Sequence, residues 1–232
     1  MQRFYLDLEL WGTLLIDEKW FFGQVSVVLR SRIWDQIILF NWDWTDYVYV
    51  ITSISKKWIW LEYKSGILNN SDSKLHITLF QALPNKFEKI DYILQKWTEV
   101  GILEFVFFRA ERSSKLVISE NKLTRFHSVV KEALEQCWWN IMPTISIIDK
   151  LEPCLIKDRT YLCHTKWTKT INENISSWNI GIIVWPEWWF SDKEISDFEK
   201  IGNIEFINFW ERILRTETMS WVLAFKLIHS WL

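Results

Sequence analysis

Two acidic and two basic side chains near the end of the chain have types and spacing that could support chemistry. They are Glu187, Arg212, Arg215 and Glu217. A carboxylate within hydrogen-bonding distance can accept a proton from a reacting group, and an arginine can hold a phosphate or stabilise developing negative charge. These four are our candidate catalytic residues. Glu217 also fits an ordinary role, as an acid facing the positive end of a helix dipole.

The candidates belong to segments that each follow a predicted strand. The segments are residues 162–165, 184–191 and 209–218. In an open parallel sheet, ligands bind beyond the carboxyl ends of the strands, so all three segments are expected around one crevice. His164 lies in the first segment, whereas His76, His127 and His229 are interpreted as core or surface residues. The spacing of histidines and cysteines fits no metal site, and no metal is predicted.

The second part of the chain alternates strands with helices, which is typical of a mostly parallel sheet packed between helices. Apolar spacing predicts a helix over 90–100 that ends at Gly101. The four residues from Ser191 to Glu194 fit a capping box at the start of another helix. Strands are predicted at 76–80, 104–108, 144–148, 160–163, 180–184 and 204–209, and further helices at about 123–137 and 216–229.

Residues 1–70 contain short β-type runs and lack a helical period. Strands are predicted at 25–30, 36–40, 47–54 and 58–63. Such a series suggests a small barrel. The polar residues 69–73 mark the boundary. We therefore expect two domains, 1–70 and 74–232.

Composition indicates an ordinary globular chain. It has 232 residues, 24% charged and 49% apolar, and a net charge of −2. No run reaches the roughly eighteen apolar residues of a membrane helix, and the start lacks the apolar stretch of a signal peptide. A soluble cytoplasmic protein with reduced cysteines is expected. Because the net charge gives no general attraction to nucleic acid, an RNA partner would require a local basic patch.

Tryptophan is abundant and glycine scarce, with 18 and 6 residues respectively. Trp42 and Trp44 flank Asp43 between two apolar runs, where a hairpin turn favours residues that tolerate positive φ. UGA is read as tryptophan in some genetic codes and as glycine in others. One hypothesis is that many of these tryptophans are such codons, and the alternative is a chain that is naturally rich in tryptophan.

Read with glycine for tryptophan, two of the late segments become V-G-P-E-G-G-F-S and F-G-E-R-I-L-R-T-E-T. The chain then resembles the bacterial 16S ribosomal RNA (uracil-N3)-methyltransferase family of the SPOUT, or α/β-knot, superfamily. That family carries G-P-E-G-G and L-G-x-R-[IV]-L-R-T-E-T. Further similar segments are residues 81–84, 95–101, 111–113 and 135–140, together with 1–4 and 28–30 near the start.

The resemblance implies an α/β fold with an RNA-binding barrel similar to a PUA domain, followed by a SPOUT methyltransferase domain with a C-terminal trefoil knot. It also implies a homodimer that uses S-adenosyl-L-methionine. Glycine allows a cofactor to approach the backbone closely, so real indoles at 185, 188 and 189 predict a weak or inactive enzyme. The cofactor-binding candidates are Leu162, His164, Val184, Trp185, Pro186, Glu187, Trp188, Trp189, Phe209, Trp210, Ile213, Leu214 and Thr216.

The implied substrate is a uridine of 16S ribosomal RNA in the small ribosomal subunit. Its N3 atom lies on the Watson–Crick edge, so the base must be unpaired or flipped out. The RNA-binding candidates are Arg3, Arg30, Arg32, Lys96, Arg109 and Arg112. Alternatives that stay open are a SPOUT enzyme acting on a ribose oxygen or on transfer RNA, a non-catalytic RNA-binding or ribosome-assembly protein, and an aromatic binding module that uses the tryptophans as such.

Overall fold

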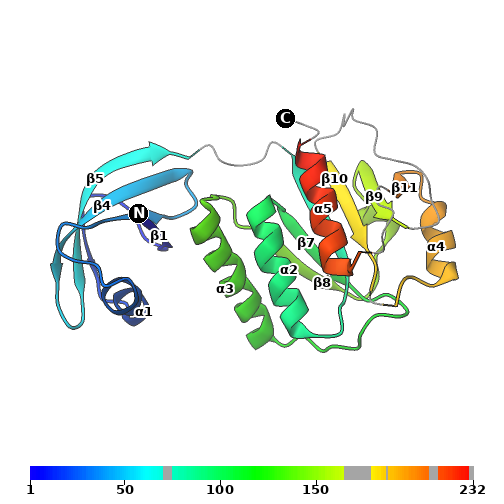
Figure 1. Ribbon diagram of the computed structural model, residues 1–232, viewed down its shortest axis with the longest axis horizontal. Helices are drawn as coiled ribbons and strands as arrows, with labels where there is room; N and C mark the ends of the chain where they lie inside the picture. Colours follow the sequence, from blue (N-terminus) through cyan, green and yellow to red (C-terminus); the bar gives the residue numbers. More distant parts are fainter. Residues whose placement is uncertain (70–74, 165–178, 187, 209–213, 230–232) are drawn as a thin grey trace. The chain divides into compact units, whose positions relative to one another are not determined.

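The computed structural model describes residues 1–69, 75–164, 179–186, 188–208 and 214–229 (Figure 1). The chain divides into two compact units. The first contains Met1–Asp72 and Leu134–Ile141, and the second contains Ser73–Ala133 and Met142–Leu232. A short segment from the middle of the sequence therefore belongs to the amino-terminal unit, which no local pattern had indicated.

The first unit is built on a five-stranded sheet in the order β1-β3-β4-β5-β2. β1 pairs with β3 in parallel, and the other neighbours are antiparallel. Phe4, Leu39, Tyr49 and Leu61 belong to its buried core. The strands are β1 (Gln2–Tyr5), β2 (Thr13–Ile16), β3 (Gln36–Phe40), β4 (Thr45–Ile54) and β5 (Ile59–Leu68).

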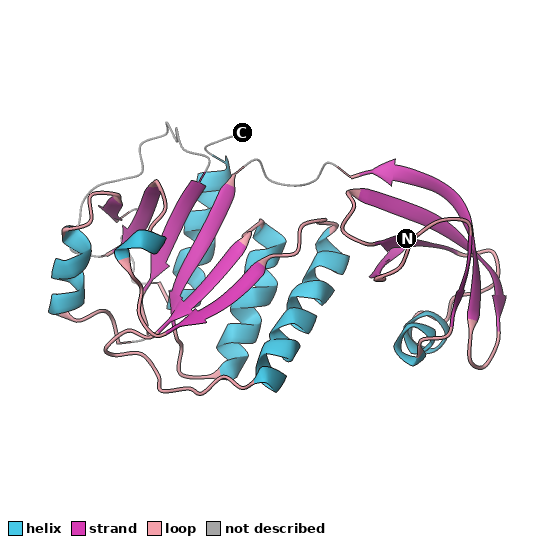
Figure 2. Cartoon of the chain, turned by 180° about the vertical axis from the view of Figure 1, so that it is seen from behind, coloured by secondary structure: helices cyan, strands magenta, loops and turns pink. Residues whose placement is uncertain are grey.

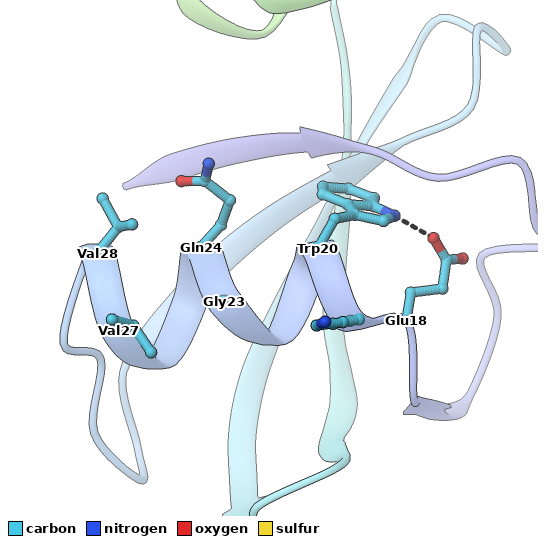
Figure 3. A pocket seen from close by; sticks show the side chains of 7 residues that line it. Glu18, Trp20, Gly23, Gln24, Val27 and Val28 are labelled. Atoms are coloured by element: carbon cyan, nitrogen blue, oxygen red, sulfur yellow. Dashed lines mark hydrogen bonds between the residues drawn. The ribbon is translucent and has the colours of Figure 1, made fainter.

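The strand expected at 25–30 was wrong, because this segment is helical. Helix α1 (Lys19–Phe22) continues into the π-helix η1 (Gly23–Val28). Phe21 and Val25 are both fully buried, and four residues apart they share one face of a helix. The β-branched residues had suggested a strand, but burial of this face favours the helix. The outer face forms an open pocket beside Trp20, whose indole N–H donates to Glu18 (Figure 3).

The second unit contains a six-stranded sheet in the order β11-β9-β10-β6-β7-β8, and every neighbouring pair is parallel. The mostly parallel sheet expected from the strand–helix alternation is confirmed. The strands are β6 (His76–Ala82), β7 (Glu104–Phe108), β8 (Thr144–Ile148), β9 (Arg159–Cys163), β10 (Asn179–Val184) and β11 (Ile204–Ile207).

The helices of this unit also follow the sequence pattern. α2 (Phe87–Val100) buries Ile90, Leu94 and Trp97, and with α5 (Thr216–His229) it lies on one face of the sheet (Figures 1 and 2). The other helices are α3 (Glu120–Cys137), which enters the first unit at its end, α4 (Asp192–Glu199) and the short 3-10 helix η2 (Pro153–Leu155).

The predicted capping box at α4 is confirmed. The Ser191 hydroxyl accepts a hydrogen bond from the Glu194 amide at 3.2 Å, and the Glu194 carboxylate accepts one from the Ser191 amide at 2.8 Å. These bonds fix the start of α4 directly after the tryptophan-rich loop that follows β10. Within the described residues, no helix has the length and apolar character needed to cross a membrane.

Candidate active site at the carboxyl edge of the parallel sheet

Three neighbouring strands end at one edge of the sheet, and the described parts of the first two predicted segments begin there. β9 lies between β10 and β11, and because the strands are parallel, the residues that follow them emerge on the same side. The His164 amide, just after β9, donates to the Ile207 carbonyl on β11 at 2.9 Å. On the other side of β9, Leu162 pairs with Ile183 of β10, so the described parts of the first two segments start side by side.

Two indoles occupy the space between the first two segments. The rings of Trp185 and Trp189 are stacked, with centroids 4.6 Å apart and planes 9° from parallel. The edge of this pair meets His164, whose ring centroid is 5.5 Å from that of Trp189. Trp185 is only 6% exposed, whereas Trp188 is 74% exposed. The side chains of Trp185 and Trp189 therefore fill the space between the loops after β9 and β10.

The end of β6 adds a polar group that the sequence analysis did not select as a site residue. Gln81 is fully buried and pairs with Val184, the last residue of β10. Its side-chain amide nitrogen donates to the Ala82 carbonyl at 2.8 Å. Within the described structure, its oxygen Oε1 has no hydrogen-bond partner. A polar residue at the end of the mostly apolar strand segment Ile77–Phe80 was the available signal.

The loop after β7 is fixed to the same edge by Glu194. One of its carboxylate oxygens caps α4, and the other accepts a hydrogen bond from the Glu111 amide at 2.9 Å. The Arg112 guanidinium donates to the Trp188 carbonyl at 3.4 Å. Arg112 is exposed, so one RNA-binding candidate lies next to the loop that carries the cofactor-binding candidates.

Of the candidate catalytic residues, the structure fully describes Arg215, which is exposed at the start of α5. Its carbonyl accepts hydrogen bonds from the amides of Thr218 and Met219 at 2.9 and 2.8 Å. Thr216 is buried and Leu214 is half-buried. Leu162, Val184 and Pro186 are buried where their strands end. Glu187, Phe209, Trp210, Arg212, Ile213 and the side chain of Glu217 lie outside the described residues.

Arg3, expected on an RNA-binding surface, is instead buried, with 1% of its surface exposed. It forms an ion pair with Asp46 at 2.8 Å. The local sequence could not reveal this, because the partner lies 43 residues away. A buried guanidinium cannot contact RNA without unfolding its surroundings, so Arg3 is not part of an RNA-binding surface.

The remaining cations differ in how freely they could meet a phosphate. Arg30 and Arg32 are exposed on the first unit. Lys96 pairs with Glu99 at 2.8 Å, and Arg109 with Asp149 at 3.3 Å. Arg30 and Arg32 are therefore better placed than Lys96 or Arg109 to bind an added anion.

Cys163 ends β9 beside the site, and burial raises the pKa of its thiol well above the ordinary value. A neutral buried thiol is a poor nucleophile and a poor metal ligand. Among the described residues, no three histidine, cysteine or acidic side chains come together as a metal site.

The fold and the site define an α/β protein whose ligand region lies at the carboxyl edge of a parallel sheet. Residues 71–228 match the family model of an RNA methyltransferase domain. The chain therefore belongs to the RNA methyltransferase family, in the branch of the ribosomal RNA small subunit methyltransferases E. The relative of that name from Buchnera aphidicola is 36% identical over 208 residues, which cover 84% of this chain and 80% of the relative.

Other relatives and solved structures agree with this placement. A ribosomal RNA small subunit methyltransferase E 2 from Borreliella burgdorferi is 34% identical over 57% of this chain and 58% of the relative. A methyltransferase structure from Legionella pneumophila with bound S-adenosylmethionine has a TM-score of 0.80 at 25% identity, covering 98% of this chain and 95% of that one. A Neisseria gonorrhoeae small subunit methyltransferase E shares the fold, with a TM-score of 0.83 at 23% identity over 100% and 98%.

Proposed function

We propose that this chain is an S-adenosyl-L-methionine-dependent methyltransferase that modifies N3 of a uridine in the 16S ribosomal RNA of the small subunit. The observation that carries the proposal is the placement of the family's loop segments. The first two lie on adjacent strands at one edge of the sheet, in a chain 36% identical to a small subunit methyltransferase E. The family membership supports the reaction class, and the resemblance of the late segments supports uracil N3 as the target atom.

The tryptophan side chains at this edge do not fit a bound cofactor. The stacked indoles of Trp185 and Trp189 fill the space between the loops, whereas a bound adenosine must lie close to the backbone. In contrast, the unpartnered oxygen of buried Gln81 fits a site completed by a hydrogen-bond donor from a ligand. The backbone and Gln81 therefore suit a cofactor site, and the indoles obstruct it.

The proposed roles of the charged residues follow from their chemistry. Glu187 or Glu217 accepts the proton that leaves uracil N3. Arg212 and Arg215 hold a phosphate or stabilise the negative charge that develops on the base. Thr216, the first residue of α5, contacts a ligand or supports the start of this helix.

The wider architecture forms part of the same proposal. The first unit is a barrel similar to a PUA domain, and the carboxyl-terminal part of the second forms a trefoil knot. The protein acts in the cytoplasm as a homodimer without a metal ion. RNA contacts come from Arg30, Arg32 and Arg112, with Lys96 and Arg109 as weaker contributors because of their ion pairs. Family resemblance supports these points.

The first experiment is calorimetric titration of S-adenosyl-L-methionine into two proteins, the printed chain and a variant with glycine at 185, 188, 189 and 210. We expect weak or no binding by the printed chain and clear binding by the variant. Trp221→Gly is the control, because this residue lies on α5 and is 41% exposed. If neither protein binds the cofactor, the proposal that this chain is a methyltransferase is refuted.

The target is tested by mass mapping of 16S ribosomal RNA after incubation of unmethylated small subunits with the glycine variant and the cofactor. A new methyl group on the base of one uridine supports the proposal. A methyl group on a ribose, or on added transfer RNA, would contradict the assigned target. The stacked indoles favour a second candidate, a non-catalytic RNA-binding protein. This candidate predicts salt-dependent RNA binding without cofactor binding by either protein.

A further inference from the structure

Tryptophan occupies backbone positions that normally require glycine. Among the described residues, six other than glycine have positive φ, and five of these six are tryptophan. Positive φ is uncommon for any side chain except those of asparagine, aspartate and histidine, and it is unfavourable for a bulky residue. The five are Trp34, Trp42, Trp44, Trp138 and Trp189, with φ values of 79, 69, 67, 67 and 62°.

Trp34 stands at the glycine position of a tight turn. The Asp35 amide donates to the Arg32 carbonyl at 3.1 Å, which makes Trp34 the third residue of the turn. A φ of 79° at that position belongs to a type II turn, where glycine is required to avoid strain. The indole gains little in return, since it is 75% exposed.

Trp42 and Trp44 lie in the hairpin between β3 and β4, on either side of Asp43. Asp43 behaves as a turn residue, since its carboxylate accepts a hydrogen bond from the Thr45 amide at 3.0 Å. Trp44 is 44% exposed. Trp42 does make contacts, stacking on Tyr5 with centroids 4.7 Å apart. This ring contact is separate from the backbone strain.

The ends of α2 and α3 allow a direct comparison. α2 ends at Gly101, with a φ of 101° and an amide that donates to Trp97 at 3.1 Å. α3 ends in the same way at Trp138, whose φ is 67° and whose amide donates to Leu134 at 3.1 Å. Glycine is the usual residue at this position because it carries no Cβ. One helix therefore has glycine and the other tryptophan in the same role.

Trp189 closes the turn of the loop after β10. Its amide donates to the Pro186 carbonyl at 3.0 Å, and its φ is 62°. This φ lies in the left-handed region, where glycine is favoured because it carries no Cβ. This position also carries the indole that meets both Trp185 and His164.

We propose that the chain produced in its source cell carries glycine at positions 34, 42, 44, 138 and 189, because their codons are read there as glycine. Three turns and one helix end, in both units of the chain, lead to the same assignment. The inference does not rest on the proposed function, since four of the five positions belong to the first unit and the candidate site belongs to the second.

The first test compares glycine with alanine at single positions, so that loss of the indole is the same in both variants. At 34, 44 and 138 we expect the glycine variant to have a roughly tenfold lower unfolding constant in urea than the alanine variant. Trp20 on α1 and Trp221 on α5 are matched controls, being 40% and 41% exposed on helices. There alanine should be the more stable by about fivefold. Alanine at least as stable as glycine at the three test positions would overturn the inference.

The second test reads the residues directly. The protein is isolated from its source cell, and its peptides covering the five positions are identified by mass. Glycine at these positions supports the inference, and tryptophan overturns it. The result does not depend on whether the protein binds a cofactor or RNA, so its failure is distinguishable from failure of the proposed function.

Discussion

Replacing Arg3 with methionine should destabilise the first unit severely. The guanidinium pairs with Asp46 at 2.8 Å and donates to the carbonyls of Leu134 and Trp139 at 2.9 and 3.1 Å. A further bond goes to the Asn140 side chain. The guanidinium carbon also lies 3.5 Å from the centroid of the Phe40 ring. This one side chain therefore attaches the segment Leu134–Ile141 to the amino-terminal strands.

The magnitude follows from what the mutation leaves behind. Arg3→Met leaves the charge of the Asp46 carboxylate without its ion-pair partner, in a site where the Asp46 side chain is 5% exposed. Breaking a buried ion pair from one side costs about 3–5 kcal/mol. Since a whole domain is stable by about 5–15 kcal/mol, a large share of the stability is at risk. Asp46→Leu combined with Arg3→Met should recover part of the loss, because neither charge is then left unpaired.

The assay is urea unfolding of the purified chain, with Arg30→Met as the control. Arg30 is exposed, so its replacement should change the free energy of unfolding by less than about 0.5 kcal/mol. A loss below about 1 kcal/mol for Arg3→Met would refute the reasoning. An RNA-contact role for Arg3 makes the opposite prediction, namely unchanged stability with weakened RNA binding.

Three further predictions concern single buried positions. Burial raises the pKa of Tyr49 to about 12 from 10, so its contribution to stability should be complete below pH 10 and lost as the pH rises through 12; urea melts should show a smaller alkaline loss for Tyr49→Phe. Gln81→Leu removes an oxygen with no partner in the described structure, which offsets the loss of the hydrogen bond from its amide nitrogen to the Ala82 carbonyl. The unfolding free energy should therefore change by less than about 1 kcal/mol, while calorimetry shows weaker cofactor binding by the variant with glycine at the four loop positions; a large loss of stability would contradict this. Gly181→Ala places a Cβ 2.9 Å from Thr160 Cγ2 and 3.0 Å from the Phe80 ring, so thermal melts should show a loss of about 1–3 kcal/mol, whereas Gly202→Ala, with nothing within 4 Å, should be neutral.

The sequence predicted the strands and helices of the second unit well, because the residue patterns that specify them are local. The apolar residues Ile90, Leu94 and Trp97 repeat at helical spacing, and Ser191 and Glu194 cap the next helix. Each pattern is contained within a few residues, so it specifies its element without knowledge of the remainder of the chain.

The wrong or missing predictions share one physical cause: the residues concerned depend on contact partners that are distant in the sequence. Val25 was assigned to a strand by its β-branched neighbours, but its burial beside Phe21 against the core of the first unit favours a helix. Arg3 was assigned to the surface by its charge, although it contacts residues more than 130 positions away. The unpartnered oxygen of Gln81 likewise depends on β7 and β10, which flank its strand. Local patterns carry no information about such partners.

The positive-φ tryptophans show how far the backbone is determined by its surroundings. In the hairpin after β3, the paired strands fix both ends of the turn. At Trp138, helix α3 fixes the preceding residues. The backbone at these positions therefore keeps its positive φ whichever side chain it carries. Each such residue costs about 1–2 kcal/mol relative to glycine, and sites without shared contacts add. In the first unit, Trp34, the hairpin with Trp42 and Trp44, and Trp138 are three sites, which together cost about 3–6 kcal/mol, a large share of the stability of a typical domain. A chain with tryptophan at these positions would lose much of its stability, so the fold itself favours glycine there.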